Sequence, residues 1–268
     1  MPDVYLTINE ADPTLLAEIA QGLEVRAALP QQVEILETYL GDIDFPRDSR
    51  VLDVGCGTGA QSRTLIQRPG VTSVVGIDRA KFLLERAREL AAGLDGLTFE
   101  EAPGDELPFA AAAFDVIVAH TVLTHVADPE AVLAELFRVL RPGGTLAICD
   151  GDFSTMSAAI GARDPLQACA ESFIEHSVND AWLMRRLPRL VREAGFVTGR
   201  ARSYNFIETE EPATTAMWFR RGADGLVKEG CIGPELAVAL KDEIERRAAA
   251  GTYFGGMKYD SLVSKKPG

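Results

Sequence analysis

The chain has 268 residues, 47% of them hydrophobic, which suffices for one large α/β domain with a cap or for two modest domains. Its formal net charge of −13 argues against binding to nucleic acid or to an anionic membrane, because both require clustered Lys and Arg. No basic segment followed by an apolar core opens the chain, and no apolar run approaches the roughly 18 residues of a membrane span. We therefore expect a cytoplasmic protein without membrane insertion.

The cysteines give no sign of a metal site or a disulfide framework. They are widely spaced and form neither a CxxC motif nor a Cys/His pair, so we expect most of them to be small buried hydrophobic residues. The four positions are Cys56, Cys149, Cys169 and Cys231.

Short β-branched runs alternate with helical patterns through the first half of the chain. This alternation is typical of successive βα units and a mostly parallel sheet. The helices are expected over 60–67, along an apolar face that includes Leu83 and Ala87, and from Asp128, an N-cap followed by Pro129, to the Pro-Gly-Gly at 142–144. In chain order the expected strands are 50–54, 72–77, 97–101, 114–119 and 145–149.

The second half is less regular, and residues 151–181 show no sustained period. A helix is expected over 183–194, bent at Pro188, followed by a strand over 196–207, a helix from Pro234 and a closing strand near 259–266. About 50 residues separate the last two strands, which is more than a hairpin connection needs. Such an insertion usually builds a cap or a binding surface.

The segment "VLDVGCGTG" at 51–59 places three glycines within five positions, between a strand and a helix. Backbone without side chains lets a ligand approach, and a helix N-terminus offers free N–H groups. The spacing differs from the G-x-G-x-x-G fingerprint of dinucleotide sites, and Asp53 would repel a pyrophosphate, so a cationic ligand suits this turn better. Asp78 ends the next strand, where related folds hold ribose hydroxyls with a carboxylate.

Four segments, "VLDVGCGTG", "VVGID", "LPFAAAAFDVIVAHTVLTHVADPEAVLAELFRVLRPGG" and "VREAGF", together resemble class I S-adenosylmethionine-dependent methyltransferases, in the broad group that includes the ubiquinone-biosynthesis enzymes. The resemblance is specific from about 48 to 150 and weaker to 207. It implies an α/β fold with a Rossmann-like, seven-stranded, mostly parallel sheet and helices on both faces. It divides the chain into a helical N-terminal lid (1–47), a cofactor-binding core (48–150) and a remainder with cap insertions at about 151–181 and 208–256.

The resemblance also implies which residues contact the cofactor, S-adenosylmethionine. The methionine end would lie over the glycine turn, the ribose on Asp78, and the amino group against the backbone carbonyl of His120. The segment before "LPF" departs from the family pattern: an ungapped count puts Pro103 at the adenine-contacting position, whereas a two-residue slide restores Gly104 and Asp105, so both remain candidates. The full expected set is Asp53, Gly55, Cys56, Gly57, Gly59, Asp78, Arg79, Leu83, Gly104, Asp105 and His120.

Methyl transfer is an in-line displacement, so the protein mainly positions the nucleophile and excludes water. A general base is needed only for a nucleophile that carries a proton with a high pKa. His125 is the candidate, in a segment where family members often carry two histidines and this chain has Thr124 first. Asp150 or Asp152 would orient His125 or replace it as base. The alternative is that His125 only packs against the helix that begins near Asp128.

The methyl acceptor is expected to be a small molecule with an oxygen, nitrogen or carbon nucleophile. Aromatic residues concentrate outside the glycine-rich core, where they would line an acceptor pocket or fasten the cap. Two other functions stay open: an NAD(P)-dependent oxidoreductase, disfavoured by the glycine spacing and the lack of a Tyr-x-x-x-Lys pair, and a non-catalytic S-adenosylmethionine-binding protein. Sparse cysteines disfavour an arsenic methyltransferase. The oligomeric state stays open.

Overall fold

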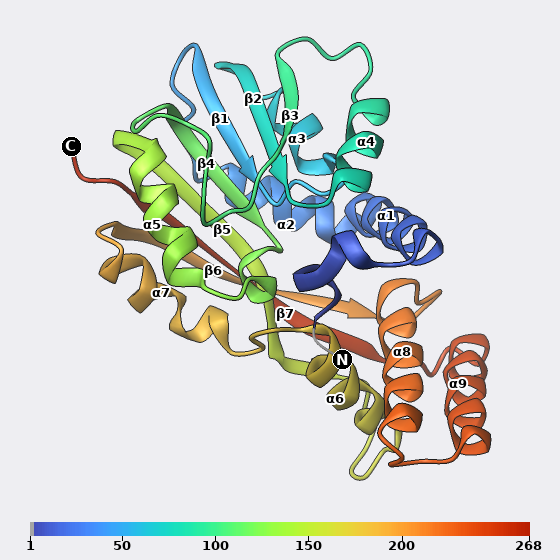
Figure 1. Ribbon diagram of the computed structural model, residues 1–268. Helices are drawn as coiled ribbons and strands as arrows, with labels where there is room; N and C mark the ends of the chain where they lie inside the picture. The colour runs from blue at the N-terminus through green and yellow to red at the C-terminus, as the bar shows by residue number, and fades with distance from the viewer. Residues whose placement is uncertain (1–2) are drawn as a thin grey trace.

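A seven-stranded sheet with the order β3-β2-β1-β4-β5-β7-β6 forms the centre of the protein in a computed structural model that describes residues 3–268 (Figure 1). The first five strands are parallel, and β7 runs antiparallel to both β5 and β6. This confirms the predicted Rossmann-like, mostly parallel sheet. The strands are β1 Ser49–Val54, β2 Val71–Asp78, β3 Leu97–Glu101, β4 Phe114–His120, β5 Leu140–Ser157, β6 Val197–Glu208 and β7 Gly255–Lys265.

Helices cover both faces of the sheet because its central strands are apolar on both sides. Alternate residues of β1 enter different clusters: Val51 belongs to the larger core, and Leu52 to the core on the other face. α5 and α7 cover the second face, and α2, α6, α8 and α9 contribute to the first. The helical elements are η1 Val4–Glu10, α1 Pro13–Ala28, α2 Pro30–Leu40, α3 Ala60–Leu65, α4 Lys81–Leu90, η2 Leu123–His125, α5 Pro129–Val139, α6 Leu166–Ser177, α7 Leu183–Glu193, α8 Thr214–Lys228 and α9 Pro234–Ala249.

Two elements differ from the expected pattern. β5 continues to Ser157 instead of ending at Cys149, because its second half pairs with β7, which begins at Gly255. The region without sustained periodicity also contains α6, whereas α7 lies where a helix with Pro188 inside it was expected. Residues 1 and 2 of the predicted lid lie outside the described residues.

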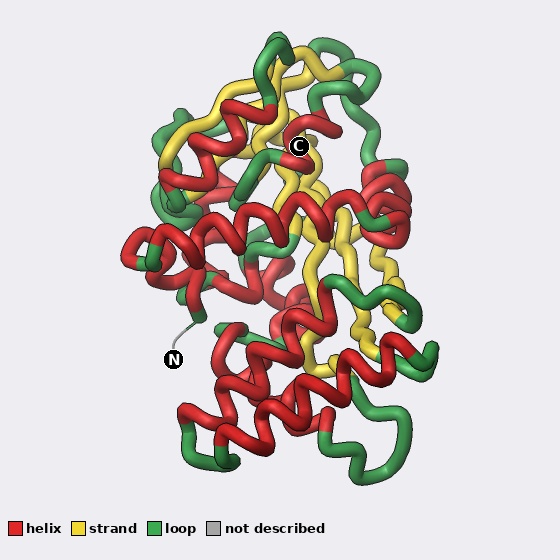
Figure 2. The backbone as a smooth tube through the Cα atoms, turned by 90° about the vertical axis from the view of Figure 1, so that its right-hand side faces the viewer, coloured by secondary structure: helices red, strands yellow, loops and turns green. Residues whose placement is uncertain are grey.

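A helical layer extends beyond one end of the sheet. α6, α8 and α9 gather at the lower end of the molecule in two perpendicular views (Figure 1, Figure 2). α6 and α8 pack closely, since a Cβ on Gly222 would overlap the carbonyl oxygen of Cys169. α8 and α9 form the insertion between β6 and β7, and α6 follows β5 in the chain.

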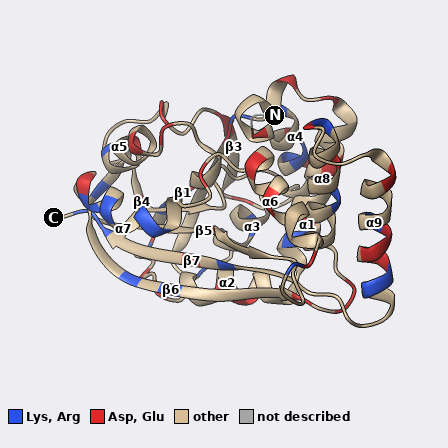
Figure 3. Cartoon of the chain, turned by 90° about the horizontal axis from the view of Figure 1, so that it is seen from below, with Lys and Arg blue, Asp and Glu red and all other residues tan. Residues whose placement is uncertain are grey.

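Charged residues lie mainly on the outer helices. Figure 3 shows acidic and basic segments interspersed along α9, where Arg246 donates to Glu243 at 2.6 Å. Among residues 3–268, no helix is long and apolar enough to cross a membrane.

Candidate active site

A glycine turn joins β1 to α3 and forms one wall of a cavity at the carboxyl ends of the parallel strands. Gly55 and Gly57 adopt positive φ angles of 64° and 53°, and both line the cavity with Cys56. A Cβ on Gly55 would lie 2.5 Å from Cγ2 of Val122, so the turn and the loop after β4 approach as closely as glycine permits. Gly59 lies outside the cavity lining.

Asp78 ends β2 with both carboxylate oxygens fixed. The N–H of Gly57 donates to Oδ2 at 2.8 Å, and the N–H of Ala80 donates to Oδ1 at 2.8 Å. Burial raises the pKa of this carboxyl. The side chain lines the cavity with Arg79 and Leu83, and each oxygen keeps lone-pair capacity for a further donor. The site can therefore hold a vicinal diol beside an apolar surface.

Asp53 stands behind the cavity instead of lining it. Its carboxylate is 1% exposed and accepts a hydrogen bond from the Ser62 hydroxyl at 2.5 Å. Burial raises the pKa of Asp53 to about 7. Asp53 therefore links β1 to α3 through Ser62, and the expected contact with the methionine portion is not supported by its position.

His120, at the end of β4, lines the cavity as a neutral group. Its Nδ1 lies 3.0 Å from the hydroxyl of Tyr39, and the two rings are stacked. Burial, followed by the positive charge of Arg26, lowers the pKa of His120 to about 3. The imidazole of His120 is therefore uncharged at neutral pH.

The loop after β3 supplies the opposite wall. Gly104 and Asp105 both line the cavity, and so does Pro103. The residue from the ungapped count, Pro103, and the residues from the two-residue slide, Gly104 and Asp105, therefore all lie at the cavity.

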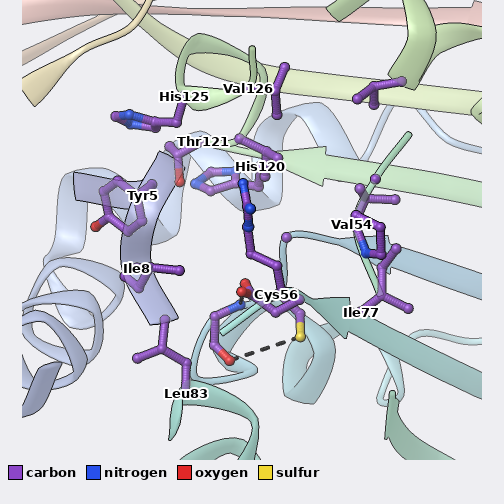
Figure 4. A pocket seen from close by; sticks show the side chains of 18 of the residues that line it. Tyr5, Ile8, Val54, Cys56, Ile77, Leu83, His120, Thr121, His125 and Val126 are labelled. Carbon is purple, nitrogen blue, oxygen red and sulfur yellow. Dashed lines mark hydrogen bonds between the residues drawn. The ribbon is translucent and has the colours of Figure 1, made fainter. Parts of the chain in front are cut away.

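His125, in the short helix η2, is paired with a carboxylate from the N-terminus. Its Nδ1 lies 2.5 Å from Oδ2 of Asp3, which is 4% exposed and also accepts from the backbone N–H groups of Tyr5 and Asn179. A carboxylate partner holds the imidazole proton on Nδ1 and leaves Nε2 as an acceptor. Tyr5 lies against the ring, with centroids 4.7 Å apart (Figure 4).

The structure places the two carboxylates expected beside His125 in other roles. Asp150 accepts from the N–H groups of Val122 and Thr124 and from the Thr124 hydroxyl at 2.9–3.1 Å, so it braces the loop that carries His125. Asp152 accepts from Nε of Arg185 at 3.1 Å. The carboxylate that contacts His125 is Asp3, which sequence reasoning missed because 122 residues separate it from His125.

Residues of the N-terminal elements complete the cavity. η1 crosses its opening and brings Tyr5 and Ile8 to the wall (Figure 4), and α1 adds Leu23 and Arg26. Nη2 of Arg26 donates to the hydroxyl of Thr121 at 2.9 Å, and within the described part of the chain it has no carboxylate partner. All four residues lie in the N-terminal segment, 1–47, for which the family resemblance implies a helical lid.

The chain matches known proteins over this same region. The family described as "Methyltransferase domain" matches residues 46–195. An uncharacterised 37.1 kDa protein in transposon TN4556 of Streptomyces fradiae is 32% identical over 259 residues, 91% of this chain and 74% of that protein. Methyltransferase GfsG of Streptomyces halstedii is 36% identical over 160 residues, 57% of this chain and 54% of that protein.

Solved structures share the fold at low sequence identity. The YcgJ protein of Bacillus subtilis aligns with a TM-score of 0.62 and 18% identity, over 87% of this chain and 98% of that chain. Phosphoethanolamine N-methyltransferase 2 of Haemonchus contortus, solved with S-adenosyl-L-methionine, aligns with a TM-score of 0.57 and 16% identity, over 88% of this chain and 53% of that chain. These matches support the fold described above.

Proposed function

This chain belongs to the class I S-adenosylmethionine-dependent methyltransferases, and from that premise we propose that it methylates a small molecule with His125 as general base. The acceptor atom is an oxygen, nitrogen or carbon nucleophile, and the base acts where that nucleophile is a hydroxyl. The observation that carries the proposal is the pairing of His125 with Asp3 at the edge of the glycine-lined cavity. Membership of this family argues against the nicotinamide oxidoreductase, and the transfer assay below decides between an enzyme and a non-catalytic S-adenosylmethionine-binding protein.

The residues of the cavity fit the cofactor. The bare backbone of Gly55 and Gly57 offers room for the methionine portion, and the fixed carboxylate of Asp78 suits two ribose hydroxyls. Leu83 and the 103–105 segment would flank the adenine. Arg26 would pair with the cofactor carboxylate. When bound, S-adenosylmethionine supplies an electrophilic methyl group on a sulfonium.

His125 would handle the proton of the acceptor. Its Nε2 would accept that proton from a hydroxyl, and the carboxylate of Asp3 would stabilise the imidazolium through Nδ1–H. η1 and α1 would exclude water as a lid, since Tyr5 and Leu23 both line the cavity. Bound cofactor should accordingly protect residues 1–40 from proteolysis.

Calorimetry with S-adenosylhomocysteine tests the cofactor site. Asp78→Ala should weaken binding by about 2 kcal/mol or more, roughly 30-fold, because it removes two acceptors for the ribose. Asp95→Ala is the matched control, because Asp95 is exposed on the loop before β3 and outside the cavity lining. No detectable binding by the wild type would refute the proposed function.

Methyl transfer itself needs a separate measurement. Release of S-adenosylhomocysteine should be detectable with at least one hydroxylated acceptor, and His125→Gln should reduce that rate while leaving cofactor binding intact. Equal rates for the variant and the wild type would remove His125 from the role of base.

A further inference from the structure

A second cavity adjoins the first and opens from the same histidine. The two share Tyr5, Leu23, Arg26 and His125 in their walls. The rest of the second cavity is built by α1, α6, α8 and the end of β5. It therefore lies on the far side of His125 from the glycine turn.

Aromatic rings form a continuous wall from His125 into this second cavity. The ring of Phe153 lies edge-on to His125 with centroids 6.0 Å apart, and Trp218 lies 6.3 Å beyond Phe153. Phe173 then stacks on Trp218 at 5.6 Å. Such a wall favours a flat apolar ligand, because rings gain from offset or edge contacts as well as from burial.

Arg221 brings an unneutralised positive charge to the same cavity. Its half-buried side chain makes no hydrogen bond or ion pair with any residue of 3–268, although its neighbour Arg220 pairs with Glu245 at 2.9 Å. The carboxylate in the cavity wall is Glu18, which is exposed and forms no ion pair within residues 3–268. In a chain with a net charge of −13, a cation left free in a partly buried cavity indicates an anionic ligand.

We propose that the second cavity binds the methyl acceptor and that the acceptor is an aromatic hydroxy acid. The ring would lie along Phe153 and Trp218, the carboxylate at Arg221 and the hydroxyl at His125. In the transfer, the hydroxyl proton passes to Nε2, an O–CH₃ bond forms, and the S–CH₃ bond breaks with its electron pair left on sulfur. This assignment rests on the proposed function and adds the acceptor class to it.

Fluorescence of Trp218 provides a direct test. The chain has two tryptophans, so Trp182→Phe, at an exposed position, leaves Trp218 as the sole reporter. This protein is saturated with S-adenosylhomocysteine and titrated with 3-(4-hydroxyphenyl)propanoate, its primary amide, and 2-(4-hydroxyphenyl)ethylamine. The acid should bind at least about tenfold more tightly than the uncharged amide or the cationic amine, because the Arg221 guanidinium would form a charge-assisted, bidentate contact with its carboxylate.

Two variants separate a specific role for Arg221 from general surface charge. Arg221→Gln should abolish the preference for the acid, whereas Arg220→Gln, one residue away on α8, should retain it. Equal binding of acid and amide, tighter binding of the amine, or no fluorescence change at millimolar acid would overturn the assignment. Calorimetry with S-adenosylhomocysteine on the same samples distinguishes the two levels: failed cofactor binding refutes the proposed function, whereas normal binding without acid preference refutes only the acceptor class.

Discussion

Replacing Asp3 by Asn should uncouple the proton-accepting role of His125 from the fold around it. In the wild type, Nδ1 of His125 donates to the Asp3 carboxylate over 2.5 Å, so Nε2 is the acceptor. An asparagine can keep Oδ1 toward the N–H of Tyr5, which now donates over 2.9 Å, and turn its NH₂ toward His125. The amide then donates to Nδ1, and the imidazole proton moves to Nε2, where it blocks proton acceptance.

The magnitude follows from the size of general-base catalysis. Such a base contributes about 10²–10⁴-fold, so kcat/KM for a hydroxylated acceptor should fall at least about 10²-fold, or about 2.7 kcal/mol. Affinity for S-adenosylhomocysteine should stay within about twofold, because Asp3 is outside the wall of the first cavity. The N–H of Asn179 also loses its acceptor, which costs about 1 kcal/mol of folding stability.

Two measurements make the argument refutable. The chain has three histidines, so ¹⁵N-histidine spectra resolve the tautomer of His125 directly. Asp12→Asn is the matched control: Asp12 also accepts a backbone N–H near the N-terminus, from Thr14 at 2.8 Å, but it makes no contact with His125. A kcat/KM within threefold of wild type for Asp3→Asn, or an unchanged tautomer, would show that Asp3 does not orient the base.

Two predictions concern stability. Burial raises the pKa of Asp53 to about 7, well above the usual range of an aspartate, so the folded state binds this proton more tightly than the unfolded chain does. Its contribution is therefore present below about pH 4 and is lost as pH rises to 7, so Asp53→Asn should flatten the pH dependence of urea unfolding between about pH 4 and 7; an unchanged slope contradicts this. Gly222→Ala should lower the free energy of unfolding by about 1–3 kcal/mol, because its Cβ would overlap the backbone of Cys169. Gly225→Ala is the control and should lower it far less, because its Cβ would meet the Ser172 hydroxyl, which can rotate away. Equal melting temperatures of the two variants would contradict the packing argument.

The sheet was predictable because its signal is local. β1 and β4 are short apolar runs, and the boundary of β1 at Val54 lies where the glycines begin. The end of β5 was not predictable, because residues beyond Cys149 are held in the strand by β7, about 100 residues later in the chain. A strand segment that is stabilised mainly by pairing with a distant strand need not show an alternating hydrophobic pattern in its own sequence.

The carboxylates of the site show the same division between local and distant information. Asp78 is the last residue of β2, and its position at the cavity was expected. Asp150 lies within β5, and one of its oxygens accepts from the loop N–H groups of Val122 and Thr124, an arrangement that no spacing in the sequence encodes. Asp3 reaches His125 only because η1 folds across the strand ends, so no nearby motif marks it.

Two histidines five positions apart lie in different surroundings. His120 is buried against the neutral hydroxyl of Tyr39, and a pKa near 3 keeps it uncharged as part of the cavity wall. His125 instead faces a carboxylate that can stabilise its protonated form. Within the proposed function Asp3 is therefore needed together with His125, because its carboxylate would hold the imidazole proton on Nδ1 and leave Nε2 free to accept a proton.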